Sequence, residues 1–311
     1  MSAAGGHGTG LRGADEVPVP PVGAAGWVTR FAPSPTGYLH LGHAYSALFA
    51  WEAARLFGGR FLLRIEDIDR QRCRPEFEKA TLEDLEWLGL TWDGQPLRQS
   101  DRLPIYAQAI DELHRQGVAY RCFCSRKRIQ DEVAEADSAP HGPSGEPIYP
   151  GTCRNLDPAT AEARVARGEP FCWRLDVGRA LARTGELHWH DHRAGTLLAR
   201  PDLLGDIVIG RKDVPTSYHL AVTVDDHLQG VTLITRGEDL FHATHVHRLI
   251  QALLGLRTPT YYHHNLLADS QGQRMSKRNR AVTLRHLRES RRTPDDIWAL
   301  IGLKPELARA G

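Results

Sequence analysis

Residues 28–43 read Val28-Thr-Arg-Phe-Ala-Pro-Ser-Pro-Thr-Gly-Tyr-Leu-His-Leu-Gly-His43, and the rest of the chain can be organised around them. The segment opens in a β-favouring run over residues 27–32, continues through prolines and a glycine that break regular structure, and leads into apolar helix formers over residues 41–56. This order predicts a strand, a turn and a helix whose N-terminal amides can face a phosphate. His40 and His43 lie where the helix begins, and both can hydrogen-bond charge that develops on a phosphoryl group.

The motif His40-Leu-Gly-His43 resembles the HIGH signature of class I aminoacyl-tRNA synthetases. The preceding Arg30-Phe-Ala-Pro-Ser-Pro-Thr-Gly37 resembles the glutamyl and glutaminyl branch of that class. Taken alone, a His-x-x-His pair at a helix start is also typical of a surface cap or of two zinc ligands. The remaining segments of the chain favour the synthetase interpretation.

A second signature near the C-terminus, Gln273-Arg-Met-Ser-Lys-Arg-Asn279, resembles the KMSKS loop. In that family the loop's lysine stabilises the pyrophosphate leaving group by its charge, and Lys277 occupies the lysine position. Arg274 replaces the first lysine of the motif and keeps its charge, whereas Arg278 replaces the final serine. A basic hexapeptide alone would be typical of a solvated loop.

The region between these signatures predicts an α/β fold. Residues 60–67 form a second apolar run that ends in charged residues, so a strand, helix, strand unit with a parallel sheet is expected. The resemblance implies the class I synthetase fold, a Rossmann-type doubly wound parallel sheet with a zinc-bearing insertion and a short helical C-terminal segment. The expected divisions are a flexible N-terminal tail (1–25), the first half of the catalytic domain (26–118), an acceptor-stem-type insertion (119–205), the second half of the catalytic domain (206–258), and the KMSKS-type loop with its helical segment (259–311).

The second half of the core is predicted from short apolar patterns. Residues 215–226 read as a loop that enters a strand, with Leu220, Val222 and Val224 on one face. Residues 230–239 read as another strand ending in charge, and residues 241–254 as a helix. His242, His245 and His247 do not share one face of that helix, so they are interpreted as packing or surface residues.

Cysteines bracket a polar loop in the expected insertion. Cys122 and Cys124 precede the loop, and Cys153 follows it. A structural zinc ion requires four tetrahedral ligands, and three thiolates are available here. The resemblance to the short glutamyl-queuosine synthetases implies Tyr149 as the fourth ligand, while His141 in the long loop stays open as a rival. Cys172 is interpreted as a small buried hydrophobe.

The family resemblance also assigns roles to individual residues. The residues implied as catalytic are His40, His43 and Lys277. The residues implied for glutamate binding are Arg30, Phe31, Ala32, Pro33, Ser34, Glu66, Tyr218 and Arg236, where Arg236 would bond the side-chain carboxylate. The residues implied for ATP binding are His40, Gly42, His43, Arg274, Met275, Ser276 and Lys277. An ion pair of Arg236 with Glu238 or Asp239 is the structural alternative for that residue.

Bulk properties restrict the partners. The net charge of +1 means that nucleic acid would have to meet a local patch, such as the arginines and Lys277 of residues 274–292. No apolar run reaches the roughly 20 residues of a membrane span, and the N-terminus does not read as a secretory signal. We expect a cytoplasmic monomer with no membrane partner.

The resemblance as a whole implies a ligase that uses ATP with Mg²⁺ to form glutamyl-adenylate. The few residues after Lys277 leave no room for the family's anticodon-binding domain, which is the pattern of synthetases that attach glutamate to queuosine in tRNA(Asp). Two alternatives remain: a minimal enzyme charging tRNA(Glu), and an inactive zinc-containing RNA-binding paralogue.

Overall fold

The architecture is that of a computed structural model, which describes residues 15–23, 25–134, 142–143, 145, 147–267 and 282–303 of the 311. Ten strands are assigned within these residues: β1 Val28–Phe31, β2 Arg60–Ile65, β3 Leu97–Arg98, β4 Ala119–Cys122, β5 Cys172–Leu175, β6 His188–Asp191, β7 Gly195–Leu198, β8 Val208–Gly210, β9 Leu233–Gly237 and β10 Thr260–His264. The α-helices within them are α1 Leu41–Arg55, α2 Pro75–Trp87, α3 Leu103–Arg115, α4 Arg126–Ala134, α5 Pro158–Ala166, α6 Val177–Thr184, α7 Tyr218–Leu228, α8 Ala243–Leu253, α9 Leu284–Glu289 and α10 Pro294–Ile301.

Parallel strands form the centre of the molecule in two sheets. One sheet has the order β1-β2-β3, and the other has the order β7-β6-β10-β9, in which only β7 runs antiparallel to its neighbour. The sheets meet where the Thr232 amide donates to the Val28 carbonyl at 2.9 Å. Parallel strands joined by helices are the arrangement that the apolar runs predicted.

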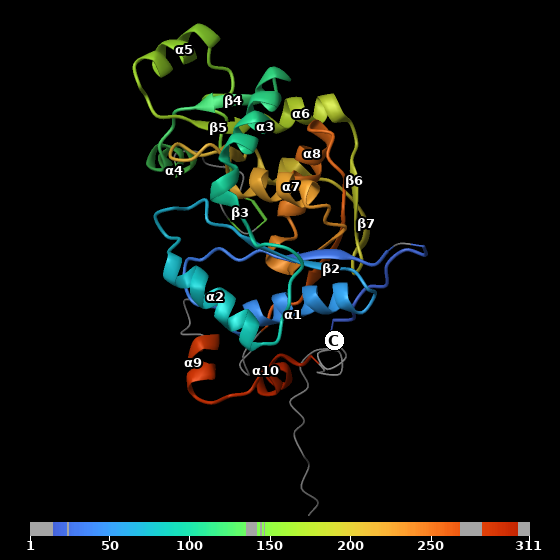
Figure 1. Ribbon diagram of the computed structural model, residues 1–311. Coiled ribbons are helices and arrows are strands. Elements are labelled where there is room, and N and C mark those ends of the chain that lie inside the picture. The colour runs from blue at the N-terminus through green and yellow to red at the C-terminus, as the bar shows by residue number, and fades with distance from the viewer. Residues whose placement is uncertain are drawn as a thin grey trace, which may run out of the picture.

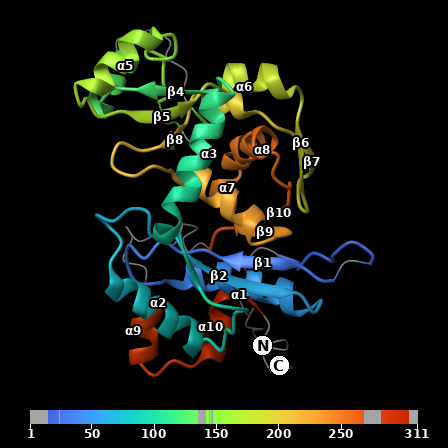
Figure 2. The same ribbon diagram turned by 45° about the horizontal axis from the view of Figure 1, so that its top comes forward.

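Helices cover both faces of this central layer. Figure 2 shows α1 beneath β1 and β2, with α2 beside it and α9 and α10 lower down, and α3, α7 and α8 on the opposite side. Successive residues of β2 serve the two faces: Phe61 and Leu63 belong to the core on the α1 side, whereas Leu62 belongs to the core on the α7 side. This alternation is the period of two that a strand covered on both faces requires.

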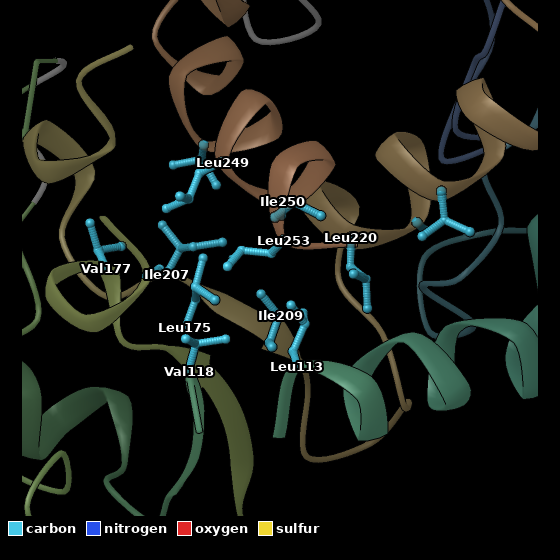
Figure 3. Close-up of a cluster of buried hydrophobic side chains, with 14 of the residues drawn as sticks. Leu113, Val118, Leu175, Val177, Ile207, Ile209, Leu220, Leu249, Ile250 and Leu253 are labelled. Carbon is cyan, nitrogen blue, oxygen red and sulfur yellow. The ribbon is translucent and has the colours of Figure 1, made fainter. Parts of the chain in front are cut away.

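The larger core lies between helices and the smaller antiparallel sheet β4-β5-β8. Figure 3 shows its buried side chains converging from several elements: Leu113, Val118, Leu175, Val177, Ile207, Ile209, Leu220, Leu249, Ile250 and Leu253. Figure 1 shows β4, β5, α4 and α5 gathered at the end of the molecule away from α9 and α10. Two strand pairings cross the predicted boundary at residue 205, since β6 pairs with β10 and β8 pairs with β5.

The prediction of a strand within residues 215–226 is wrong, because this segment forms α7. Ser217 is the N-cap, and its hydroxyl accepts a hydrogen bond from the Leu220 amide. Leu220 and Val224 are buried on helical spacing, but Val222 is buried as well. Because the helix is enclosed on several sides, its apolar residues also satisfy the two-residue alternation of a strand. The β-branched residues in this segment added to the preference for a strand over a helix.

The N-terminal segment differs from the expected flexible tail at residues 15–23. The Asp15 carboxylate accepts hydrogen bonds from the Tyr45 hydroxyl at 2.6 Å and from the Asn265 amide at 3.0 Å. The Trp27 indole donates to the Pro18 carbonyl at 2.8 Å. These bonds attach the segment to α1 and to the end of β10, whereas residues 1–14 lie outside the described residues. No helix among the described residues is long and apolar enough to cross a membrane.

Candidate active site

A cavity of about 560 Å³ opens at the carboxyl ends of β1, β2, β9 and β10. This is the edge at which parallel α/β sheets bind ligands, at the point where the chain switches from one side of the sheet to the other. Its walls include all of the residues assigned to glutamate binding: Arg30, Phe31, Ala32, Pro33, Ser34, Glu66, Tyr218 and Arg236. His40, Gly42 and His43 also line it, so the fold brings these predicted residues together.

The two motif histidines are fixed by the start of α1. His40 is the N-cap, and its Nδ1 accepts the Gly42 amide at 3.1 Å, while Nδ1 of His43 accepts the His40 amide at 3.2 Å. In a neutral ring these bonds leave the hydrogen on Nε2 of each histidine. A Cβ on Gly42 would lie 3.0 Å from the His40 ring, so glycine allows the ring to pack against the backbone.

The predicted KMSKS-type residues Arg274, Met275, Ser276 and Lys277, like His141, lie outside the described residues. Both described flanks of that loop are at the cavity. Leu267 lines it, and Thr283 forms a β-bridge with His40. The flank before the loop therefore lies at the cavity, and the flank after it lies beside His40.

A buried ion-pair network supports one wall. Asp226 of α7 accepts Arg30 Nε at 2.9 Å and Arg64 Nη1 at 2.7 Å, and Arg64 also contacts Glu66 at 3.2 Å. Burial alone would raise the pKa of Asp226, but Arg30 and Arg64 hold that pKa below its ordinary value. Burial raises the pKa of Glu66 despite the opposing charge of Arg64. An ammonium group in the cavity would favour the ionised form of Glu66.

Arg236 projects from β9 into a set of neutral groups. Its Nε donates to His263 Nε2 at 3.1 Å, and its Nη1 lies 3.3 Å from His247 Nδ1 and 3.4 Å from the Tyr218 hydroxyl. Its Nη2 donates to the Thr244 hydroxyl. Within the described chain no ion pair joins it to Glu238 or Asp239, so the structural alternative for Arg236 is wrong there. Arg236 is 5% exposed, and it lines the cavity.

Sequence reasoning missed the histidines around Arg236. Burial lowers the pKa of His263 to about 4 and the pKa of His219 to about 4, and it lowers the pKa of His247 well below its ordinary value. All three are therefore neutral near pH 7. His247 is buried, as the packing interpretation expects, but it also contacts Arg236, which the sequence did not indicate. His245 is a packing residue against Trp189.

Comparison with known proteins agrees with this geometry. Residues 27–303 match the family model of the catalytic domain of class I tRNA synthetases (E and Q). The chain belongs to this family. A glutamyl-Q tRNA(Asp) synthetase of Rhodobacter capsulatus is 48% identical over 89% of this chain and 100% of its own length, and one of Nocardia farcinica is 41% identical over 94% and 90%. A glutamate–tRNA ligase of Aquifex aeolicus is 38% identical over 89% of the chain but 57% of its own length.

Solved structures agree with the fold of this class I synthetase. The crystal structure of glutamate-tRNA synthetase from Elizabethkingia anophelis superposes with a TM-score of 0.70 at 29% identity, covering 82% of this chain and 53% of that chain. The chain thus spans about half the length of the glutamate-type enzyme whose fold it shares. The α/β fold with a parallel sheet and flanking helices is confirmed.

The synthetase also contains a buried cysteine cluster between β4 and the segment before α5. The thiols of Cys122, Cys124 and Cys153 lie within 4.8 Å of one another, and all three residues are buried. The Tyr149 hydroxyl lies 3.3 Å from Cys122 Sγ and 3.7 Å from Cys124 Sγ, and the sulphurs of Cys124 and Cys153 are 3.6 Å apart.

These separations can be tested against a metal site. Tetrahedral zinc with Zn–S bonds of about 2.3 Å places two sulphurs about 3.8 Å apart, and a sulphur and an oxygen about 3.5 Å apart. The three buried thiols are therefore compatible with a zinc ion, and the Cys124–Cys153 separation and the distances from Tyr149 to Cys122 and Cys124 are close to these values. Cys172 is buried opposite Cys122 in the antiparallel pair β4–β5, but it is not one of the three clustered thiols.

Proposed function

We propose that this synthetase activates L-glutamate with ATP and transfers the glutamyl group to the queuosine base at the wobble position of tRNA(Asp). The observation that carries the first half is the charge arrangement of the cavity. Arg236 is held by neutral groups at one wall, and Glu66 lines the same cavity. An amino acid with a side-chain carboxylate and an ammonium group complements these two charges.

The binding roles follow from the contacts. Arg236 can form a charge-assisted bond to the side-chain carboxylate, and the Tyr218 hydroxyl beside it can donate a further hydrogen bond. Glu66, held by Arg64, can accept hydrogen bonds from the ammonium group of the substrate. Arg30 is neutralised by Asp226, so we assign it to shaping the wall formed by residues 31–34 rather than to adding net charge.

The chemical step needs positioning and charge stabilisation. An oxygen of the α-carboxylate of glutamate attacks the α-phosphorus of ATP, the bond to the bridging oxygen breaks, and pyrophosphate leaves. We assign the Nε2–H groups of His40 and His43 to the phosphate oxygens, and the charge of Lys277 to the leaving pyrophosphate. Mg²⁺ carried by ATP would neutralise part of the phosphate charge.

The cysteine cluster is proposed as a structural zinc site with Cys122, Cys124, Cys153 and Tyr149 as ligands. Its donors are buried and do not line the catalytic cavity. A closed set of four protein ligands is typical of structural rather than catalytic zinc. The metal would join β4 to the segment before α5 and stabilise this end of the molecule.

The acceptor is proposed from the relatives. Two proteins named glutamyl-Q tRNA(Asp) synthetase align over 90% or more of their own length at 41–48% identity, whereas the glutamate–tRNA ligase of Aquifex aeolicus aligns over 57% of its length. Because this chain is also similar to a glutamate–tRNA ligase, tRNA(Glu) is a second candidate acceptor.

Two assays test the proposal. ATP–pyrophosphate exchange should require glutamate rather than glutamine or aspartate, and Arg236→Ala should raise the KM for glutamate far more than the KM for ATP. An equal rise in the KM values for glutamate and ATP would exclude a role of Arg236 in binding the side-chain carboxylate. Labelled glutamate should then appear on tRNA(Asp) that contains queuosine and be absent from tRNA(Asp) that lacks it. Label on tRNA(Glu) would establish the charging enzyme instead.

A further inference from the structure

Three neighbouring strands carry a continuous chain of buried polar side chains. Asp191 ends β6, His263 lies in the adjacent strand β10, and Arg236 lies opposite His263 in β9. Asp191 Oδ2 is 2.7 Å from His263 Nδ1, and Arg236 Nε is 3.1 Å from His263 Nε2. The side chains of Asp191 and His263 are only 1% and 3% exposed.

The partners of His263 determine where its proton lies. A carboxylate only accepts hydrogen bonds, so Nδ1 of His263 must carry the hydrogen that bonds to Asp191. Arg236 only donates, so Nε2 must present its lone pair. The Thr244 hydroxyl, 3.2 Å from Nε2, can donate to the same atom while it accepts from Arg236. Every contact therefore requires one tautomer, with the hydrogen on Nδ1.

Asp191 is held independently of the histidine. Its other oxygen accepts the amides of Arg193 at 2.9 Å and Ala194 at 3.0 Å in the turn between β6 and β7. The His263 amide donates to Oδ2 at 3.1 Å. The carboxylate is thus rigid, and a rigid acceptor fixes both the ring orientation and its tautomer.

We propose that Asp191 and His263 are positioning residues that orient Arg236 toward the side-chain carboxylate of the amino-acid substrate. This inference rests on the proposed function for the identity of that substrate. A guanidinium binds a carboxylate well only when its planar fork faces it, and the bond from Nε to His263 fixes the plane in which the Nη groups lie at the cavity wall. Packing alone would require no particular tautomer of His263.

The test compares variants that remove or retain the acceptor at Nε2. His263→Leu removes this acceptor. Asp191→Asn presents an amide that can donate to Nδ1, which favours hydrogen on Nε2. The Nε2–H group would then face the Nε–H group of Arg236, and neither can accept a hydrogen bond from the other. His263→Gln can present an amide oxygen near the position of Nε2. His245→Gln is the matched control, since His245 is also buried but bonds to Trp189 and does not line the cavity.

In glutamate-dependent ATP–pyrophosphate exchange, His263→Leu and Asp191→Asn should raise the KM for glutamate about tenfold to hundredfold, the range for one hydrogen bond to a charged group. The KM for ATP and kcat should stay within about threefold. His263→Gln should recover most of the loss, and His245→Gln should match the wild type. A parallel rise in both KM values, or no difference between His263→Leu and His245→Gln, would overturn the proposal.

A second measurement does not depend on catalysis. Nitrogen-15 NMR of the histidine rings should show His263 with hydrogen on Nδ1 in the wild type and a changed tautomer in Asp191→Asn. Hydrogen on Nε2 in the wild type would refute the positioning role even if glutamate is the substrate. Wild-type protein that lacks glutamate-dependent exchange but shows the expected tautomer would refute the proposed substrate and leave the orientation of Arg236 supported.

Discussion

Replacing Asp226 by asparagine removes the central charge of the buried network beside the cavity. Asp226 is 4% exposed at its side chain and bonds to two arginines at 2.9 and 2.7 Å. Without its charge, Arg30 and Arg64 share Glu66 as the remaining carboxylate of this network. Removing one partner of a buried ion pair costs about 3–5 kcal/mol. Because asparagine keeps the shape and one acceptor, we expect a loss of about 3 kcal/mol in the free energy of unfolding at pH 7.

The pH dependence of this loss follows from the lowered pKa of Asp226. A carboxyl whose folded pKa is depressed contributes stability above its unfolded pKa, near 3.9, and loses it as the pH falls through the folded value. The difference between wild type and Asp226→Asn should therefore be constant from about pH 5 to 8. It should shrink below about pH 4.

Urea unfolding followed by circular dichroism measures both effects. Asp213→Asn is the matched control, because Asp213 pairs with Arg211 at 2.8 Å but is 46% exposed. Exposed pairs contribute at most about 1 kcal/mol, so this variant should remain close to the wild type. Equal losses in the two variants, or a loss below about 1 kcal/mol for Asp226→Asn, would refute the reasoning from burial.

Three further predictions concern other parts of the molecule. Burial raises the pKa of Glu52 in α1 to about 7, so the folded state keeps this proton to a higher pH than the unfolded state does. The free energy of unfolding should therefore fall by up to about 3 kcal/mol as the pH rises from about 4.5 to 7. Urea titrations of Glu52→Gln should lack that fall, and an equal dependence on pH in the variant and the wild type would contradict the prediction. Cys122→Ser should lower the zinc content measured by atomic emission and destabilise the region around β4, whereas full metal retention would remove the zinc assignment. Asp15→Ala should lower the free energy of unfolding by about 2 kcal/mol, because Tyr45 and Asn265 lose a charged acceptor; an unchanged value in denaturant titrations would show that the segment is not held through Asp15.

The histidines around Arg236 give the cavity a particular electrostatic character. Burial keeps His247 and His263 neutral, so they accept hydrogen bonds from Arg236 without adding positive charge. A carboxylate at this position would neutralise the arginine before any substrate arrived. Neutral acceptors orient the guanidinium and leave its charge for the ligand, which is why their chemistry matters to specificity.

Sequence reasoning succeeded where the relevant contacts are local. The strand and helix on either side of residues 32–40 and the cysteines around one loop involve residues close in sequence, so their spacing already indicates that they lie together. It failed at α7, where burial on several sides hid the helical period. It also missed the contact of His247 with Arg236, because a histidine's position on its own helix does not reveal which distant group it meets.

The sequence by itself determined the strand, turn and helix of residues 28–55, since short-range hydrogen bonds and backbone restrictions act within a few residues. Its motifs also indicated the class I tRNA synthetase family (E and Q) to which the chain belongs. Only the tertiary structure decided how the charges are paired. Arg30 meets Asp226 across 196 positions, and Asp191 meets His263 across 72. Such bonds depend on which strands become neighbours, and that choice is made by burial of the whole chain rather than by any local pattern.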